Sequence, residues 1–251
     1  MEKKIIAAGD ASESFLESLA KVDDKVGSRK TKKNQELEEN WIIKRYFMLL
    51  DQVKAIAYPI KIMKDESPDF LVVEGIAYYG IEVTQSTSED FQVLLAESDK
   101  GHGEFFDPTS IKYDRQSVQH GKKPTRRKYT KQELQKMLHK DFSKALATPA
   151  RMGSPHPSAA QWATDAVKNK IETIRSWPQK KTETTRILLY ENGPDPIFDN
   201  HDFKAILKEK LLSTFNDGSV DPKAIPVDCL LGDGRHLVFD VLNSSRLISM
   251  N

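Results

Sequence analysis

Two carboxylates in the stretch 67–85, which reads SPDFLVVEGIAYYGIEVTQ, are placed where they could bind a cation. Asp69 begins one apolar, β-branched run and Glu82 lies near the end of the next, so the pattern predicts two consecutive strands. The period of two in a strand puts Glu82 and Thr84 on one face and Val83 on the other. A carboxylate inside so apolar a strand is costly to bury unless it is paired or holds a metal. The alternative is a hairpin whose acids simply face water.

The order Pro68-Asp69, followed by Glu82-Val83-Thr84 in a strand, resembles the two-part core motif of the PD-(D/E)XK nuclease superfamily. In that family the two acids and the intervening backbone carbonyl bind a divalent cation. The resemblance therefore implies that Asp69, Glu82 and Val83 hold Mg²⁺, for which Mn²⁺ can substitute. The chain departs from the motif at Thr84, where the family usually has its catalytic lysine. The implied activity is hydrolysis of phosphodiester bonds in a bacterial or phage restriction or defence setting. We expect DNA as the substrate, although the residues do not distinguish DNA from RNA.

A helix preceding these strands could supply a third acid. The apolar residues of 36–53 recur at threes and fours, which predicts an amphipathic helix with acids in its first turn. Acids at that place also suit the helix dipole without any further role. Glu39 lies on the apolar row that includes Tyr46 and Leu50, and nuclease-superfamily members often contribute an acid from such a helix. We therefore expect Glu39 to be the third acid, with Glu38 as the alternative.

A second helix, predicted over 158–177, could supply the missing lysine. Lys170 falls in the middle of the apolar face that includes Ile174, and a lysine aimed at the core needs an acidic or phosphate partner. The alternative is a lysine whose ammonium reaches solvent past its own stem. Some nuclease-superfamily members resemble this arrangement, in which a neighbouring helix provides the cation that Thr84 lacks here. Gln85 is a further candidate for contact with water or phosphate, although it points to the opposite strand face from Glu82.

A basic strip over 112–141 carries many more lysines and arginines than acids and includes two tyrosines. Such a strip can neutralise phosphates and stack on exposed bases, although a solvated loop and helix face would look the same. The strip predicts a nucleic-acid-binding surface centred on Lys122, Lys123, Arg126, Arg127 and Lys128.

The composition excludes several other classes of protein. The net charge is +1 with 30% charged residues, so affinity for polyanions must come from local patches. A single cysteine, Cys229, excludes a disulfide framework and a multi-cysteine zinc site, and we expect it to be buried. No apolar run is long enough for a membrane helix, and residues 1–15 lack the apolar core of a signal peptide. We expect a cytoplasmic protein without a membrane partner.

The predicted elements indicate an α/β fold with a mixed central sheet flanked by helices. The resemblance, which covers about 36–90 and 160–250, implies the restriction-endonuclease-like version of this fold. We expect a polar N-terminal extension over 1–35, with a short helix at 12–22, and a single nuclease-like domain over 36–251 with a basic helical insertion at about 99–157. The expected strands are 59–64, 69–73, 76–84, 186–190, 227–231 and 236–242. The expected helices outside the insertion are 12–22, 36–53, a short one that includes 91–95, 158–177 and 201–215.

The leading hypothesis is thus a Mg²⁺-dependent nuclease acting on DNA, for which a homodimer would suit cleavage of both strands. The alternative is a catalytically inactive nuclease-like module that binds nucleic acid or another protein, and Thr84 in the lysine position supports it. A third reading is a small-molecule- or protein-binding α/β domain whose acids have no chemical role. Fold-level likeness by itself cannot choose among these functions.

Overall fold

The computed structural model describes residues 3–24, 32–86, 156–178, 181–191, 200–215, 225–232 and 234–249. These residues belong to one compact unit, made of Met1–Gly27, Thr31–Thr87 and Pro155–Asn251. None of its described helices is long and apolar enough to cross a membrane. The expected basic insertion, and with it the strip 112–141, lies outside the described residues, as does the short helix expected to include 91–95.

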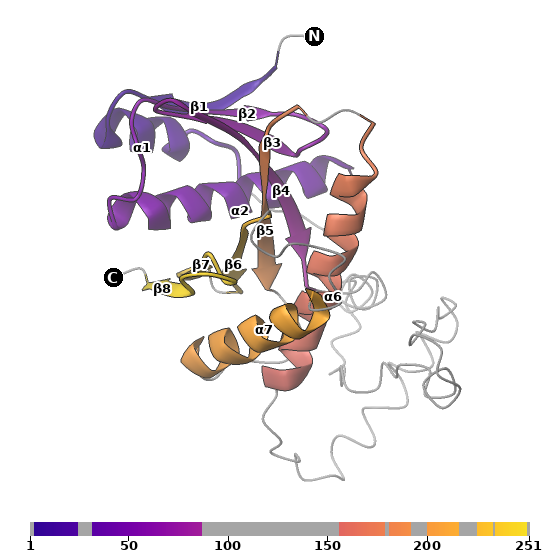
Figure 1. The fold of residues 1–251 in the computed structure, drawn as a ribbon. Helices are drawn as coiled ribbons and strands as arrows, with labels where there is room; N and C mark the ends of the chain where they lie inside the picture. Colours follow the sequence, from indigo (N-terminus) through magenta and orange to yellow (C-terminus); the bar gives the residue numbers. More distant parts are fainter. Residues whose placement is uncertain are drawn as a thin grey trace, which may run out of the picture. The chain divides into compact units, whose positions relative to one another are not determined.

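The described strands form one mixed sheet in which neighbours follow the order of the chain (Figure 1). The strands β1, β2, β3 and β4 each pair with the next one in an antiparallel direction, and so do β6, β7 and β8. Between them, β5 runs parallel to both β4 and β6. The strands are β1 (Ile5–Gly9), β2 (Ile60–Lys64), β3 (Phe70–Glu74), β4 (Ala77–Gln85), β5 (Thr184–Glu191), β6 (Val227–Leu231), β7 (His236–Phe239) and β8 (Arg246–Ser249).

Helices cover both faces of the sheet. On one face α1 (Ser12–Ala20) and α2 (Lys32–Gln52) bury a core that includes Phe15, Tyr46 and Phe47. On the other face α6 (His156–Arg175) and α7 (Asn200–Phe215) pack on a second core that includes Val167 and Phe203. Figure 1 shows α6 and α7 together on the side of the strands opposite to α2. We call these two sides the α2 face and the α6 face.

The alternation of side chains in β4 determines what each face receives. Ile81 and Val83 are buried in the core under α2, as the period of two predicts for one side of the strand. Gly80 and Glu82 therefore point to the α6 face. A Cβ atom added to Gly80 would lie 2.5 Å from Pro68 Cγ, so the glycine lets Pro68 pack directly on β4. This close approach fixes the position of the segment that leads into Asp69.

The α/β class and the mixed sheet with flanking helices are confirmed. The strands that we predicted at 59–64, 69–73, 76–84, 186–190 and 227–231 are present with small shifts at their ends. The helices that we predicted at 12–22, 36–53, 158–177 and 201–215 are present as well. The hairpin between β6 and β7 is confirmed by antiparallel pairing, and Cys229 is buried as expected.

Two strands were not predicted. β1 pairs with the edge of β2, so residues 5–20 form a strand and a helix of the sheet domain where we expected a polar extension. The run that we assigned to one strand at 236–242 ends at Phe239, and β8 pairs with it after a turn. Both new strands are short and lie toward the outer edges of the sheet, where few core-facing side chains are needed to form them.

Candidate active site

The regular β3–β4 pairing ends at the pair Phe70 and Ile81. The two predicted acids, Asp69 and Glu82, lie directly beyond this pair. The backbone N–H of Asp69 donates to Glu82 Oε2 at 3.0 Å. In the other direction, the backbone N–H of Val83 donates to Asp69 Oδ2 at 2.8 Å. The two carboxylates therefore replace the next bonds of the ladder, and their mutual placement is fixed by the backbone.

Helix α6 brings a lysine to the same place. Lys170 Nζ donates to Glu82 Oε1 at 2.7 Å, and the Glu82 side chain is only 6% exposed. Val167, Ile171 and Ile174 are buried on the same side of α6, so the packing of this apolar stripe aims Lys170 at β4. The core-facing lysine predicted from the sequence thus meets an acid of the predicted motif.

Helix α2 contributes an acid from the opposite face. Glu39 forms an ion pair with Lys64 at the end of β2, and its other oxygen accepts a hydrogen bond from Gln35 Nε2 at 3.0 Å. The alternative acid, Glu38, is buried separately with an exposed fraction of 8%. Glu39 thus reaches the end of β2, where Lys64 lies opposite Phe70, the neighbour of Asp69.

Burial and the neighbouring carboxylates of Glu82 and Glu39 raise the pKa of Asp69 to about 7, while the charges of Lys170 and Lys64 act in the opposite direction. A shift of this kind marks a carboxylate that the fold holds beside like charges without full compensation. Such groups gather at functional sites, where a bound cation or substrate supplies the missing charge.

Asp69→Asn is expected to stabilise the protein at about pH 8 and to change its stability little at about pH 4. In the folded protein Asp69 keeps its proton up to about pH 7, whereas the ordinary value is 3.8. The stability contributed by this group therefore falls as the pH rises between these two values. Asparagine cannot ionise, and its side-chain oxygen can still accept the Val83 N–H. We expect a gain on the order of 2–4 kcal/mol at high pH, measured by urea unfolding.

Glu74→Gln is the control for that measurement. Glu74 lies at the other end of β3, where it accepts hydrogen bonds from the Ala57 backbone N–H and the Tyr79 hydroxyl. Its replacement should give no gain at high pH. Equal stability of Asp69→Asn and wild type at high pH would contradict the assignment of an uncompensated charge to Asp69.

Asp69 and Glu82 are the residues of this site that could hold a hard divalent cation. Mg²⁺ takes one or two carboxylates and keeps several waters, so Asp69 and Glu82 suffice as side-chain ligands. Within the described part of the chain, Asp69 Oδ1 has no hydrogen-bond partner. The N–H and C=O of one strand residue point the same way, so the Val83 carbonyl faces the side of Asp69 as its N–H does. Among the described residues, no group of three or more His, Cys, Asp or Glu side chains is arranged so that it could hold a metal ion.

The structure brings together Asp69, Glu82, Lys170 and Glu39, but not every predicted residue. Gln85 shares the strand face of Val83, so it points to the α2 face and away from Lys170. The five basic residues at 122, 123 and 126–128 lie outside the described residues.

Lys64 was missed. It ends β2, lies with its Nζ 4.1 Å from the centre of the Phe70 ring, and pairs with Glu39. We predicted the strand 59–64 but assigned no role to its last residue. A usable signal was present, because the alternation in this strand puts Lys64 on the same side as the buried Ile60 and Ile62.

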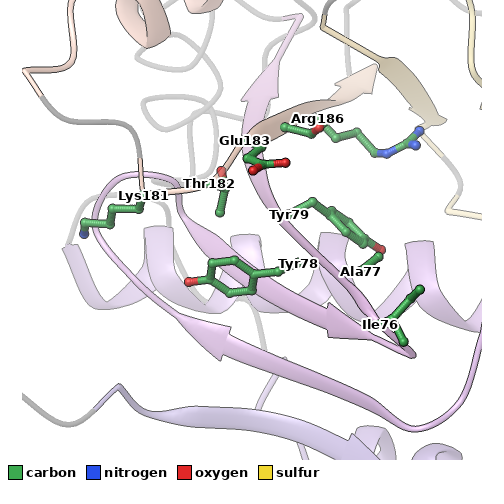
Figure 2. Close-up of a pocket in the computed structure, with 9 residues that line it drawn as sticks. Ile76, Ala77, Tyr78, Tyr79, Lys181, Thr182, Glu183 and Arg186 are labelled. Atoms are coloured by element: carbon green, nitrogen blue, oxygen red, sulfur yellow. The ribbon is translucent and has the colours of Figure 1, made fainter.

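A separate hollow of about 790 Å³ lies where β4 and β5 begin, and Figure 2 shows its lining. Tyr78, Tyr79 and Lys181 line this hollow. The candidate-site residues, which are Asp69, Glu82, Lys170 and Glu39, do not line it. Its arginine, Arg186, donates to the buried carboxylate of Asp228 at 2.7 Å. The guanidinium charge is therefore already compensated, and the hollow lacks the exposed acid cluster that a metal site requires.

Neither a family model, nor a curated protein, nor a solved structure matches this chain. The geometry of Asp69, Glu82, Lys170 and Glu39 is therefore the basis on which a function can be inferred.

Proposed function

We propose that the protein is a metal-dependent nuclease that hydrolyses phosphodiester bonds, with DNA as the expected substrate. The observation that carries the proposal is the meeting of three chemical groups from three separate elements: Asp69 before β3, Glu82 in β4 and Lys170 in α6. A metal-binding pair of carboxylates beside an ammonium group is what hydrolysis of a phosphate diester requires.

Each residue has a role in this proposal. Asp69, Glu82 and the Val83 carbonyl would hold Mg²⁺, and Mn²⁺ could replace it. When bound, the cation lowers the pKa of a bound water and neutralises charge on the phosphate. Lys170 would stabilise the negative charge that develops on the phosphate oxygens. Glu39 would orient the attacking water from the α2 face.

The test is cleavage of linear duplex, circular duplex and single-stranded DNA in the presence of Mg²⁺, Mn²⁺ or EDTA. The proposal expects cutting with either metal and none with EDTA. Products from circular DNA would show that the enzyme cuts internally. Absence of cleavage on every substrate under both metals would reject the proposal, provided that the protein is folded by circular dichroism.

Lys170→Ala is expected to lower the rate of cleavage by about 10²–10³-fold, the usual cost of removing one preorganised group that stabilises transition-state charge. Lys170→Arg should retain part of the rate because it keeps the positive charge. Lys168→Ala, two positions away on the same helix, is the matched control and should cleave like wild type. Unchanged cleavage by Lys170→Ala would remove the lysine from the mechanism while leaving the metal site in place.

A second candidate function is a nuclease-like module that binds nucleic acid without cutting it. Two observations favour it: Thr84 stands at the usual lysine position, and three carboxylate oxygens of Asp69 and Glu82 already accept hydrogen bonds from the protein. This function predicts salt-sensitive binding of DNA with no metal-dependent cleavage. The cleavage test above distinguishes the two.

A further inference from the structure

Two ion pairs flank Asp69, one on each face of the sheet. Lys170 pairs with Glu82 on the α6 face, and Lys64 pairs with Glu39 on the α2 face. Lys64 lies opposite Phe70 in the β2–β3 pairing, next to Asp69, and Lys170 reaches Glu82, whose other oxygen accepts the Asp69 backbone N–H. Both ammonium groups therefore lie close to the same central carboxylate, and the site contains two cations where the motif that the sequence resembles would supply one.

The balance of charge at this site changes sign when a divalent cation binds. Three carboxylates, those of Glu39, Asp69 and Glu82, face the two ammonium groups of Lys64 and Lys170. With all five groups ionised the site carries one net negative charge, which repels a phosphate. A bound divalent cation leaves one net positive charge and competes with the ammonium groups for the carboxylates.

A second contact, with the ring of Phe70, holds the Lys64 ammonium group independently of Glu39. Its Nζ lies 4.1 Å from the centre of the Phe70 ring, and Phe70 is fully buried opposite Lys64 in the β2–β3 pairing. An aromatic face attracts an ammonium group, so the ring can keep Lys64 in place after Glu39 turns away. The Lys64 side chain is 18% exposed, so it is not sealed inside the core.

We propose that Lys64 is a second phosphate-binding residue, held by Glu39 until a divalent cation draws Glu39 away. This inference rests on the proposed nuclease function and adds an order to it: the metal binds, the ion pair opens, and the freed ammonium binds a phosphate next to the scissile one. Metal and nucleic acid then favour each other's binding, and the coupling must be reciprocal.

The experiment measures binding of a fluorescent DNA oligonucleotide by anisotropy, in EDTA and in Ca²⁺, with the oligonucleotide checked for integrity on a gel. In wild type we expect Ca²⁺ to raise the affinity by on the order of tenfold, within the ordinary range of coupling between two sites. Lys64→Gln should lose most of this gain, and Lys64→Arg should keep it. Lys61→Gln is the matched control, because Lys61 lies on the other face of the same strand.

Glu39→Gln separates this role from a structural ion pair. If Glu39 holds Lys64 back, removing its charge should raise the affinity for DNA in EDTA. If the pair only fastens α2 to the sheet, the variant should bind no better than wild type and melt at a lower temperature. The second result overturns the inference.

Titration of each protein with Mn²⁺ by calorimetry, without DNA, distinguishes failure of this inference from failure of the proposed function. Lys64→Gln should bind the metal at least as tightly as wild type, because the carboxylate of Glu39 is released. A wild-type protein that binds no metal would reject the metal-dependent function together with this inference. Metal binding and a Ca²⁺ gain that persists in Lys64→Gln would reject the role of Lys64 alone.

Discussion

Asp69→Asn is expected to lower metal-dependent cleavage by about 10³-fold or more. Asp69 is the centre of the site: Val83 fixes one of its oxygens, the other has no partner among the described residues, and Glu82 bonds its backbone. Loss of a charged ligand removes several kcal/mol of transition-state stabilisation, and each 1.36 kcal/mol is about tenfold in rate. The measurement is the single-turnover rate on the DNA that wild type cleaves best.

The same substitution separates chemistry from folding. Because Asp69→Asn should be more stable than wild type at about pH 8, low activity at that pH cannot be attributed to unfolding. Glu82→Gln should also be inactive, but it loses the ion pair to Lys170. We therefore expect no gain in stability from this variant at about pH 8. Glu74→Gln, at the far end of β3, should keep the wild-type rate. An Asp69→Asn variant with full activity would exclude Asp69 as a metal ligand.

Local patterns were sufficient to predict most of the sheet and the three elements that form the site. The strands around Asp69 and Glu82 are short apolar runs bounded by turn residues, and their alternation decides which face each side chain joins. The position of Lys170 followed from the period of α6, because a helix with one apolar stripe has only one face to bury. These features depend on residues close together in the chain.

Features that depend on distant residues were harder to predict. Lys64 acquires a role only because α2 places Glu39 against the end of β2, and no spacing in the sequence relates these two residues. β1 forms because an exposed edge of β2 accepts it, and its five residues carry little signal of their own. The apolar row of the helix at 36–53 indicated Glu39 before Glu38, but its partner Lys64 is found only from the packing of α2 against the end of β2.

A buried carboxylate in the core, that of Asp228, has no contact with the residues of the candidate site. Asp228 in β6 is completely buried, and burial raises the pKa of its carboxyl group. It accepts hydrogen bonds from the Tyr46 hydroxyl at 2.8 Å, from Arg186 at 2.7 Å and from the backbone N–H of Asp240 at 2.7 Å. This carboxylate therefore connects α2, β5 and the end of β7 through one residue.

Asp228→Ala is expected to destabilise the protein by about 3–5 kcal/mol, because it leaves the mostly buried Arg186 guanidinium and the buried Tyr46 hydroxyl without their acceptor. Urea unfolding measures this loss, and the melting temperature should fall by roughly 2–4 °C for each kcal/mol of lost stability. Tyr46→Phe removes one donor and should cost only about 1 kcal/mol.

The double variant Asp228→Leu with Arg186→Met tests whether the loss comes from the unpaired charge. Replacing both partners of a buried pair with apolar groups is often neutral, so the double variant should recover the part of the loss that comes from the unpaired charge. The Tyr46 hydroxyl and the Asp240 backbone N–H still lack their acceptor in it. If it remains as unstable as Asp228→Ala, the three elements depend on the hydrogen bonds themselves. Since Asp228 contacts none of the residues proposed for catalysis, the stabilised double variant should also cleave DNA at the wild-type rate.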